Sequence, residues 1–273
     1  MRRRAHWLPF AAAALVTLVC VLAPALPIGD PLKMSMGARF AGFGAAHPLG
    51  QDEFGRDVLS RLVWGTRSSL FIAVCSSVLA GIVGTALGIL AGYVRGAAEL
   101  LTMRAMDVLL CFPALILALL FVTLYGSGVG TLIPILAVLF VPGFTRVAYS
   151  SVLTVRSLEY VEAARALGAS DLRIMVRTIL PNVGAPLLVQ LSFAIAAAVV
   201  LESGLSFLGL GVIPPSPSLG LMIGSARSTM GHAPHLLLWP CLTLTLLVIT
   251  LNAVCDALRD ILDPRSSAAA TLD

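Results

Sequence analysis

The stretch from Val108 to Thr145, VLLCFPALILALLFVTLYGSGVGTLIPILAVLFVPGFT, runs for 38 residues without a charge. A helix crosses the hydrocarbon core of a bilayer with about 20 apolar residues, so this stretch is too long for one crossing and long enough for two. The run Gly126-Ser127-Gly128-Val129-Gly130 near its middle supplies a turn. The sequence therefore predicts two membrane helices here, over about 108–125 and 131–152.

The composition of the whole chain is that of a membrane protein. Of its 273 residues, 58% are hydrophobic and 12% are charged, and the mean hydropathy is +0.97. A soluble domain carries roughly 25% charged residues, so a soluble enzyme, a nucleic-acid-binding module and a disordered tail are excluded. The cysteines lie in apolar stretches without metal-ligand spacing, and we interpret them as small hydrophobic residues. They are Cys20, Cys75, Cys111, Cys241 and Cys255.

Further uncharged runs predict four more crossings, over about 7–28, 68–94, 184–208 and 236–255. The first of them follows a basic start, Met1-Arg2-Arg3-Arg4, and a secretory signal peptide is the alternative for this segment. Its uncharged run of 22 residues is longer than the core of a signal peptide, which favours a retained helix. The expected fold is an all-α polytopic membrane protein with six transmembrane helices.

The distribution of Lys and Arg predicts the orientation. With the N-terminus inside, twelve of these residues fall in inner segments and six in outer segments, which is the bias typical of cytoplasmic loops. Both termini are therefore predicted to be cytoplasmic. We expect residues 1–66 to form the first helix and an outer loop, residues 67–260 a five-helix core, and residues 261–273 a short cytoplasmic tail.

The longest inner segment, residues 153–181, is predicted to form two short helices outside the membrane. Glu162 and Arg165 have the i, i+3 spacing of a pair on a helix surface. Gly168 suits the left-handed residue that ends a helix, and Ser170 can cap the next one, with Asp171 in its first turn. Pro181 marks the next break. An ordinary solvated loop helix is the alternative that the residues leave open.

Glu162-Ala163-Ala164, Gly168 and Leu180-Pro181 resemble the EAA loop of bacterial ATP-binding-cassette (ABC) importer permeases. Three other stretches resemble the dipeptide/oligopeptide/nickel subfamily of these permeases. They are HPLGQDEFGRDVLSR at 47–61, ESGLSFLGLGVIPPSP at 202–217 and LRDILDPR at 258–265. The resemblance covers nearly the whole chain and indicates the C-type permease subunit, with an ABC type-1 permease domain over 67–260 and an ATPase-coupling loop over 153–181.

The resemblance implies a translocation subunit, not an enzyme, that passes peptides or a related small solute through a bacterial inner membrane. The implied partners are a second homologous permease, two cytoplasmic ABC ATPases, an extracytoplasmic substrate-binding protein and the lipid bilayer, with no nucleic acid. ATP and Mg²⁺ would be bound by the ATPases; this chain has no P-loop pattern and is expected to hold no cofactor or metal. The residues expected to contact an ATPase are Glu159, Glu162, Ala163, Ala164, Gly168, Leu180 and Pro181.

Two further features are candidates for a role. Ala80, Gly84, Gly88 and Gly92 recur every four residues and place small side chains on one helix face, for close packing within the bundle or against the sister permease. Glu202 lies well inside an apolar run, near the outer end of its helix, where it could anchor at the interface or serve a proton or solute. The outer-side or gate candidates are Glu202, Ser206, Phe207 and Gly209.

Other functional classes are less consistent with the sequence. A proton-coupled secondary transporter, the main alternative, needs carboxylates near the midplane, and Glu202 is the one available but lies too far out. An intramembrane hydrolase needs a nucleophile and base, and neither G-x-S-G nor H-E-x-x-H occurs. His232 and His235 lack nearby metal ligands and are interpreted as loop residues.

Overall fold

The computed structural model describes residues 7–25 and 28–262; their regular secondary structure is helical, apart from one isolated bridge between Gln51 and Asp57, and irregular loops connect the helices. The longer helices are α1 (Trp7–Leu22), α2 (Val58–Val94), α3 (Ala97–Leu110), α4 (Ala114–Tyr125), α5 (Val129–Val155), α9 (Gly184–Phe207), α10 (Leu219–Thr229) and α11 (His235–Leu262). The short elements are η2 (Met36–Ala38), α6 (Glu159–Ala166), α7 (Asp171–Ile174), η3 (Met175–Ile179) and α8 (Leu180–Asn182).

Four helices in the described part of the chain are long and apolar enough to cross a membrane: α2, α5, α9 and α11. The pair α3 and α4 makes a fifth candidate if it counts as one span, and α1 is a shorter apolar helix of 16 residues. The predicted all-α membrane fold is thereby confirmed, while the number of six crossings stays a prediction.

The helix predicted over 108–125 is wrong in its extent. The chain instead forms α3 from Ala97 and α4 to Tyr125, and these two helices meet at an angle of 89°. Pro113 stands between them as the residue that precedes α4, and proline cannot continue a helix because it lacks an N–H and clashes with the preceding turn. A count of uncharged runs missed α3, because this helix contains Glu99, Arg104 and Asp107.

α2 begins ten residues before the predicted start at 68, so the predicted domain boundary between 66 and 67 falls inside a continuous helix. Asp57 fixes the earlier start, because its Oδ2 accepts a hydrogen bond from the backbone N–H of Ser60 at 2.7 Å. The predicted first helix over 7–28 is also too long: α1 ends at Leu22, shortly before Pro24.

The remaining bounds follow the sequence more closely. α5 and α9 match the predicted crossings within three residues at each end, and the turn between α4 and α5 uses Gly126 and Gly128 at positive φ. α11 extends past the predicted end at 255 and through the start of the expected tail, most of which lies outside the described residues. α10 was not expected as a helix.

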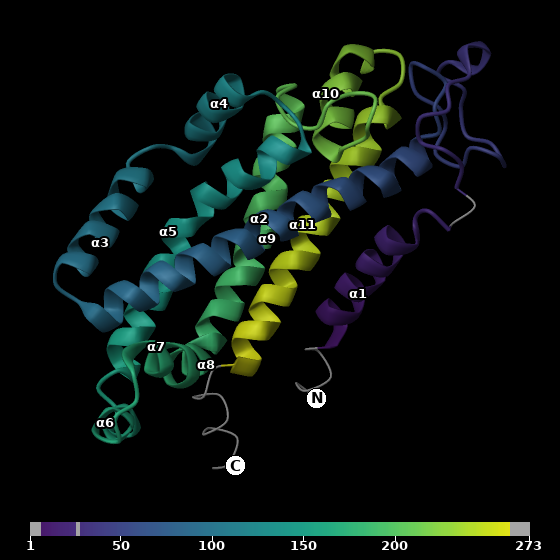
Figure 1. The fold of residues 1–273 in the computed structure, drawn as a ribbon. Helices are drawn as coiled ribbons and strands as arrows, with labels where there is room; N and C mark the ends of the chain where they lie inside the picture. Colours follow the sequence, from purple (N-terminus) through teal and green to yellow (C-terminus); the bar gives the residue numbers. More distant parts are fainter. Residues whose placement is uncertain (1–6, 26–27, 263–273) are drawn as a thin grey trace.

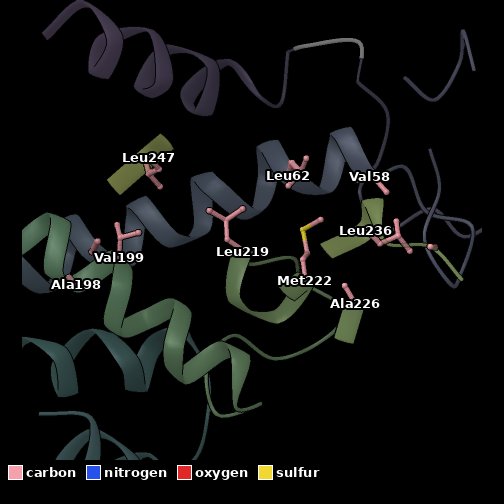
Figure 2. Close-up of a cluster of buried hydrophobic side chains, with 11 residues drawn as sticks. Val58, Leu62, Ala198, Val199, Leu219, Met222, Ala226, Leu236 and Leu247 are labelled. Atoms are coloured by element: carbon pink, nitrogen blue, oxygen red, sulfur yellow. The ribbon is translucent and has the colours of Figure 1, made fainter. Parts of the chain in front are cut away.

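The elements gather at two ends of the bundle (Figure 1). α6, α7 and α8 lie at one end, together with the first turn of α1 and the last turn of α11, while α10 and residues 28–57 lie at the other. A buried apolar cluster joins α2, α9, α10 and α11 near the second end. In Figure 2, Val58 and Leu62 of α2 lie close to Leu219 and Met222 of α10.

Candidate functional site

The 159–182 segment, from α6 through α8, is the part of the chain that contains the EAA-like residues. α6 ends at Ala166, and Gly168 follows with φ +79°, the left-handed conformation that the sequence predicts there. A Cβ atom added at Gly168 would meet no atom within 4 Å. The turn therefore needs glycine for its backbone conformation and not for lack of space.

Three buried side chains attach this segment to the bundle. Val161 of α6, Ile174 of α7 and Ile179 of η3 are fully buried in a cluster with Ile89 and Tyr93 of α2. The segment thus packs on the end of α2 and, through Val152 in the same cluster, on the end of α5. Any movement of the segment must therefore change its contacts with both helices.

A polar contact joins the same elements. The hydroxyl of Tyr93 donates a hydrogen bond to Oδ1 of Asp171 at 2.6 Å, and Arg165 donates to the Tyr93 hydroxyl at 3.3 Å with its guanidinium over the ring. The hydrogen bond that Arg165 donates to Tyr93 raises the pKa of Arg165. The predicted ion pair between Glu162 and Arg165 is wrong, because Arg165 turns toward Tyr93. Ser170 precedes α7 as predicted, but its side chain makes no capping hydrogen bond.

Pro181 does not break the helix where the sequence predicts. The chain widens into the π-helical turn η3 just before it and then interrupts its helix at Val183, which has φ −97° and ψ 4°. A π-type turn shifts the hydrogen-bond register, so that the helix accommodates the missing N–H and the bulky ring of proline.

The outer face of the 159–182 segment is exposed to solvent. Leu167, at the turn after α6, is 88% exposed and Leu172 of α7 is 69% exposed. Glu159, Glu162 and Ala163 are exposed as well. Large apolar side chains on a surface that also carries acidic groups are typical of a protein interface.

The small residues of α2 lie against α5 of the same chain. A Cβ atom on Gly84 would approach Cβ of Phe144 to 2.6 Å, and one on Gly88 would approach both Cβ of Ala148 and the carbonyl oxygen of Thr145 to 2.5 Å. Gly92 faces Val152 in the same way, and Ala80 is fully buried. The stripe therefore lets α2 and α5 approach closely within one subunit.

Glu202 of α9 is fully buried. Its Oε1 accepts a hydrogen bond from Ser206 at 2.6 Å, and the Ser206 hydroxyl accepts one from the backbone N–H of Val212 at 3.2 Å. A carboxylate with no exposed surface cannot anchor at the membrane interface, so the anchoring alternative is contradicted. The contacts of Glu202 instead join α9 to the segment that follows it.

Of the other outer-side candidates, Ser206 contacts Glu202, whereas Phe207 and Gly209 are not brought together with it. Phe207 and Gly209 are exposed, and Gly209 has φ +79° in the turn after α9. Gly211 and Gly220 are the closely packed glycines here: a Cβ atom on Gly211 would lie 1.9 Å from Oγ of Ser206, and one on Gly220 would lie 2.1 Å from the carbonyl oxygen of Ser203.

The sequence analysis missed a buried ionic network in residues 28–61. Oδ2 of Asp52 accepts a hydrogen bond from Nε of Arg56 at 2.7 Å and lies 3.5 Å from Nε of Arg61. Burial, together with the charge of Asp52, raises the pKa of Glu53. The five charged residues at 52–61, in a chain that is otherwise mostly apolar, were the available signal. No group of His, Cys, Asp and Glu among residues 7–25 and 28–262 is arranged to hold a metal ion, and His235 begins α11 instead of lying in a loop.

Comparison with known proteins gives consistent matches. The di/tripeptide transport system permease protein DppC of Pseudomonas aeruginosa is 42% identical over 222 residues, covering 81% of this chain and 73% of that protein. The glutathione transport system permease protein GsiD of Pectobacterium atrosepticum is 41% identical over 224 residues, covering 82% and 74%. The MetNI methionine ABC transporter, in an inward-facing conformation, shares the fold with a TM-score of 0.61 at 19% identity, covering 74% of this chain and 96% of that chain.

The match to a family extends over most of the predicted core. Residues 84–268 match the family described as the binding-protein-dependent transport system inner membrane component. The match begins inside α2 and includes the 159–182 segment, α9 and α11. The family match and the relatives agree with the resemblance seen in the sequence, and the chain belongs to the permeases of binding-protein-dependent ABC transport systems.

Proposed function

We propose that this permease forms, with a second homologous permease, the membrane path of an importer for peptides or a related small solute. The observation that carries the substrate class is the identity above 40% to permeases named for di/tripeptide and glutathione transport. An extracytoplasmic binding protein would deliver the solute, and two cytoplasmic ABC ATPases would bind ATP and Mg²⁺ and drive transport. The location is the bacterial inner membrane.

We further propose that the 159–182 segment is the coupling site for an ATPase. Its exposed face offers Leu167 and Leu172 for contact, and Glu159, Glu162 and Ala163 are exposed as well, while Ala164 is half-buried against the cluster on α2. Its buried face is attached to α2 and α5 through Val161 and Ile174. A push on the exposed face would therefore be transmitted to two long helices. Gly168, Leu180 and Pro181 would set the angles between the short helices.

The proposed topology has six crossings and cytoplasmic termini. The crossings would be α1, α2, the bent pair α3 and α4, α5, α9 and α11. This topology is supported by Figure 1, where the first turn of α1 and the last turn of α11 lie at the same end of the bundle as α6–α8. Single cysteines at Ser35 and Ser267, in a background without the native cysteines, test this with an impermeant thiol reagent in intact cells. Labelling at 35 alone is expected; labelling at 267 alone would contradict the topology.

The proton-coupled alternative has no support from the comparisons, and Glu202 is already hydrogen-bonded to Ser206. Uptake into vesicles that contain both permeases, the ATPases and the binding protein distinguishes the two mechanisms. ATP should drive uptake of a labelled dipeptide without a pH gradient. Uptake that needs only the pH gradient would reject the ABC mechanism.

A further inference from the structure

The end of α2 that lies beside the 159–182 segment is fixed to the end of α5. Arg156, the residue that follows α5, donates a hydrogen bond from Nη1 to the carbonyl oxygen of Gly92 at 3.0 Å. A Cβ atom added at Gly92 would lie 2.9 Å from Cβ of Val152, so the two helices touch here. The hydroxyl of Tyr149 on α5 also donates a hydrogen bond to Glu99 of α3, just beyond α2. The ends of α2 and α5 therefore form one unit.

Tyr93, the last residue but one of α2, connects this unit to the 159–182 segment. Its side chain is 8% exposed and belongs to the apolar cluster that contains Val161 and Ile174. Its hydroxyl donates a hydrogen bond to Oδ1 of Asp171 at 2.6 Å and accepts one from Nη2 of Arg165 at 3.3 Å. One oxygen atom of α2 thus contacts both the last turn of α6 and the first residue of α7.

The bond from Tyr93 is suited to set the direction of α7. A helix of four residues cannot fix its own direction, and Ser170 supplies no capping hydrogen bond. Apolar contacts such as those of Ile174 are non-directional, whereas a hydrogen bond weakens steeply when its angle or length changes. Among the side-chain hydrogen bonds of the described residues, the one from Tyr93 to Asp171 joins α7 to another helix. The orientation of α7 on α2 therefore depends on this hydroxyl.

We propose that the hydroxyl of Tyr93 is the positioning group that transmits a movement of the 159–182 segment to α2 and α5. The inference rests on the coupling site proposed above and assigns the contact through which that site acts. When an ATPase moves the exposed face of the segment, Asp171 pulls on Tyr93 and so on the unit formed by the two helix ends. Without the hydroxyl, the apolar cluster still attaches the segment, but α7 slides on α2 and part of the movement is lost.

The first test compares ATP hydrolysis with uptake of the labelled dipeptide in the vesicles described above. Tyr93→Phe removes the hydroxyl and keeps the ring that fills the apolar cluster. The amount of dipeptide imported per ATP should fall about tenfold, the effect that loss of one charge-assisted hydrogen bond can produce. Asp171→Asn keeps an oxygen that accepts from Tyr93 and should retain most of the native ratio, whereas Asp171→Ala should match Tyr93→Phe. Combining Tyr93→Phe with Asp171→Ala should add nothing further, because both remove the same bond.

Tyr125→Phe is the matched control for the loss of a tyrosine hydroxyl. Tyr125 is 72% exposed at the end of α4, and its hydroxyl makes no hydrogen bond within the described residues. This variant should keep the native ratio of uptake to ATP hydrolysis. If the Tyr93 hydroxyl only stabilised the fold, Tyr93→Phe would lower the yield or the thermal midpoint, but the transporters that assemble would keep the native ratio. That result would overturn the inference.

A second measurement separates the inference from the proposed substrate class, because it needs no transported solute. Spin labels are attached to Ile82→Cys on α2 and Leu246→Cys on α11, two exposed positions, in an assembled transporter whose permease lacks its five native cysteines. Trapping ATP with vanadate on the ATPases should change the distance between the labels, and Tyr93→Phe should reduce this change. No change in the native background, or an equal change with Tyr93→Phe, would overturn the inference. If the vesicles import no dipeptide while the change in distance depends on Tyr93, the substrate class is wrong and the inference stands.

Discussion

At the end of the bundle that holds α10 and residues 28–57, charged side chains are buried and paired within the chain. At the end that holds α6–α8, apolar side chains such as Leu167 are exposed instead. Asp52, Arg56 and Arg61 are each less than one-tenth exposed at the first end. The first end therefore pairs its buried charges within the chain, while the second offers an exposed apolar surface that a partner can cover. The two should respond differently to substitution.

The contact of α2 with α5 joins the two ends, and breaking it should have the largest effect. Gly88→Leu would force a side chain against the carbonyl oxygen of Thr145 and Cβ of Ala148, each 2.5 Å from the first added atom. Backbone atoms cannot yield as a flexible side chain does, so the helices must separate. We expect loss of the folded subunit, measured as the yield of monodisperse protein in detergent.

Ala86→Leu is the matched control for Gly88→Leu, because Ala86 is exposed on the opposite side of α2. It should leave the yield of the subunit nearly unchanged. Equal yields of the two variants would show that the α2–α5 contact tolerates an added side chain and does not hold the ends together.

Breaking the ionic network should have the next largest effect. Asp52→Ala leaves Arg56 and Arg61 buried without their carboxylate, a change that typically costs about 3–5 kcal/mol. The measurement is the thermal midpoint of the purified subunit. Asp30→Ala removes an exposed carboxylate and should lower the midpoint far less. A small effect of Asp52→Ala would mean that this end is not stabilised by its buried charges.

At the opposite end, Gly168→Val should affect transport more than stability. A β-branched residue at φ +79° is strained by about 1–2 kcal/mol, but the space around Gly168 is open. The subunit should insert normally while ATP-driven uptake falls severalfold, because the short helices rotate relative to each other. Gly231→Val, at an open glycine without positive φ, should be silent. Normal uptake by Gly168→Val would reject the coupling assignment.

The sequence could predict features that depend on neighbouring residues, but not contacts between distant ones. Local patterns were sufficient for the turn at Gly168, the start of α9 at Gly184 and the spacing of Gly84 and Gly88. The contact of Tyr93 with Asp171 joins residues 78 positions apart, and no local pattern indicates it.

Paired charges were the main source of error in the helix bounds. A count of uncharged runs stops at Asp107, but Arg146 pairs with this residue, and Glu99 of α3 is hydrogen-bonded to the hydroxyl of Tyr149. Arg67 set the predicted start of the α2 crossing at 68 in the same way, although α2 continues through it and its guanidinium lies over the ring of Trp64. Pairing lowers the cost of a charge inside a helix bundle, and a single sequence does not show which charges will meet.

The smallest effect is expected at Glu53, which belongs to the end that holds α10 and residues 28–57 and whose ionised form is unfavourable there. Burial and the nearby Asp52 raise the pKa of Glu53, so the folded state disfavours its ionised form. A folded-state pKa above the unfolded value lowers stability at pH values above it, and this loss disappears as the pH falls through the raised pKa. Glu53→Gln should therefore raise the thermal midpoint slightly at neutral pH and match the native protein under acidic conditions. Glu159→Gln, an exposed carboxyl at the other end, should not change the midpoint. If Glu53→Gln lowers the midpoint at neutral pH, the attraction of Arg56, Arg61 and Arg39 outweighs burial, and the whole network at this end is stabilising.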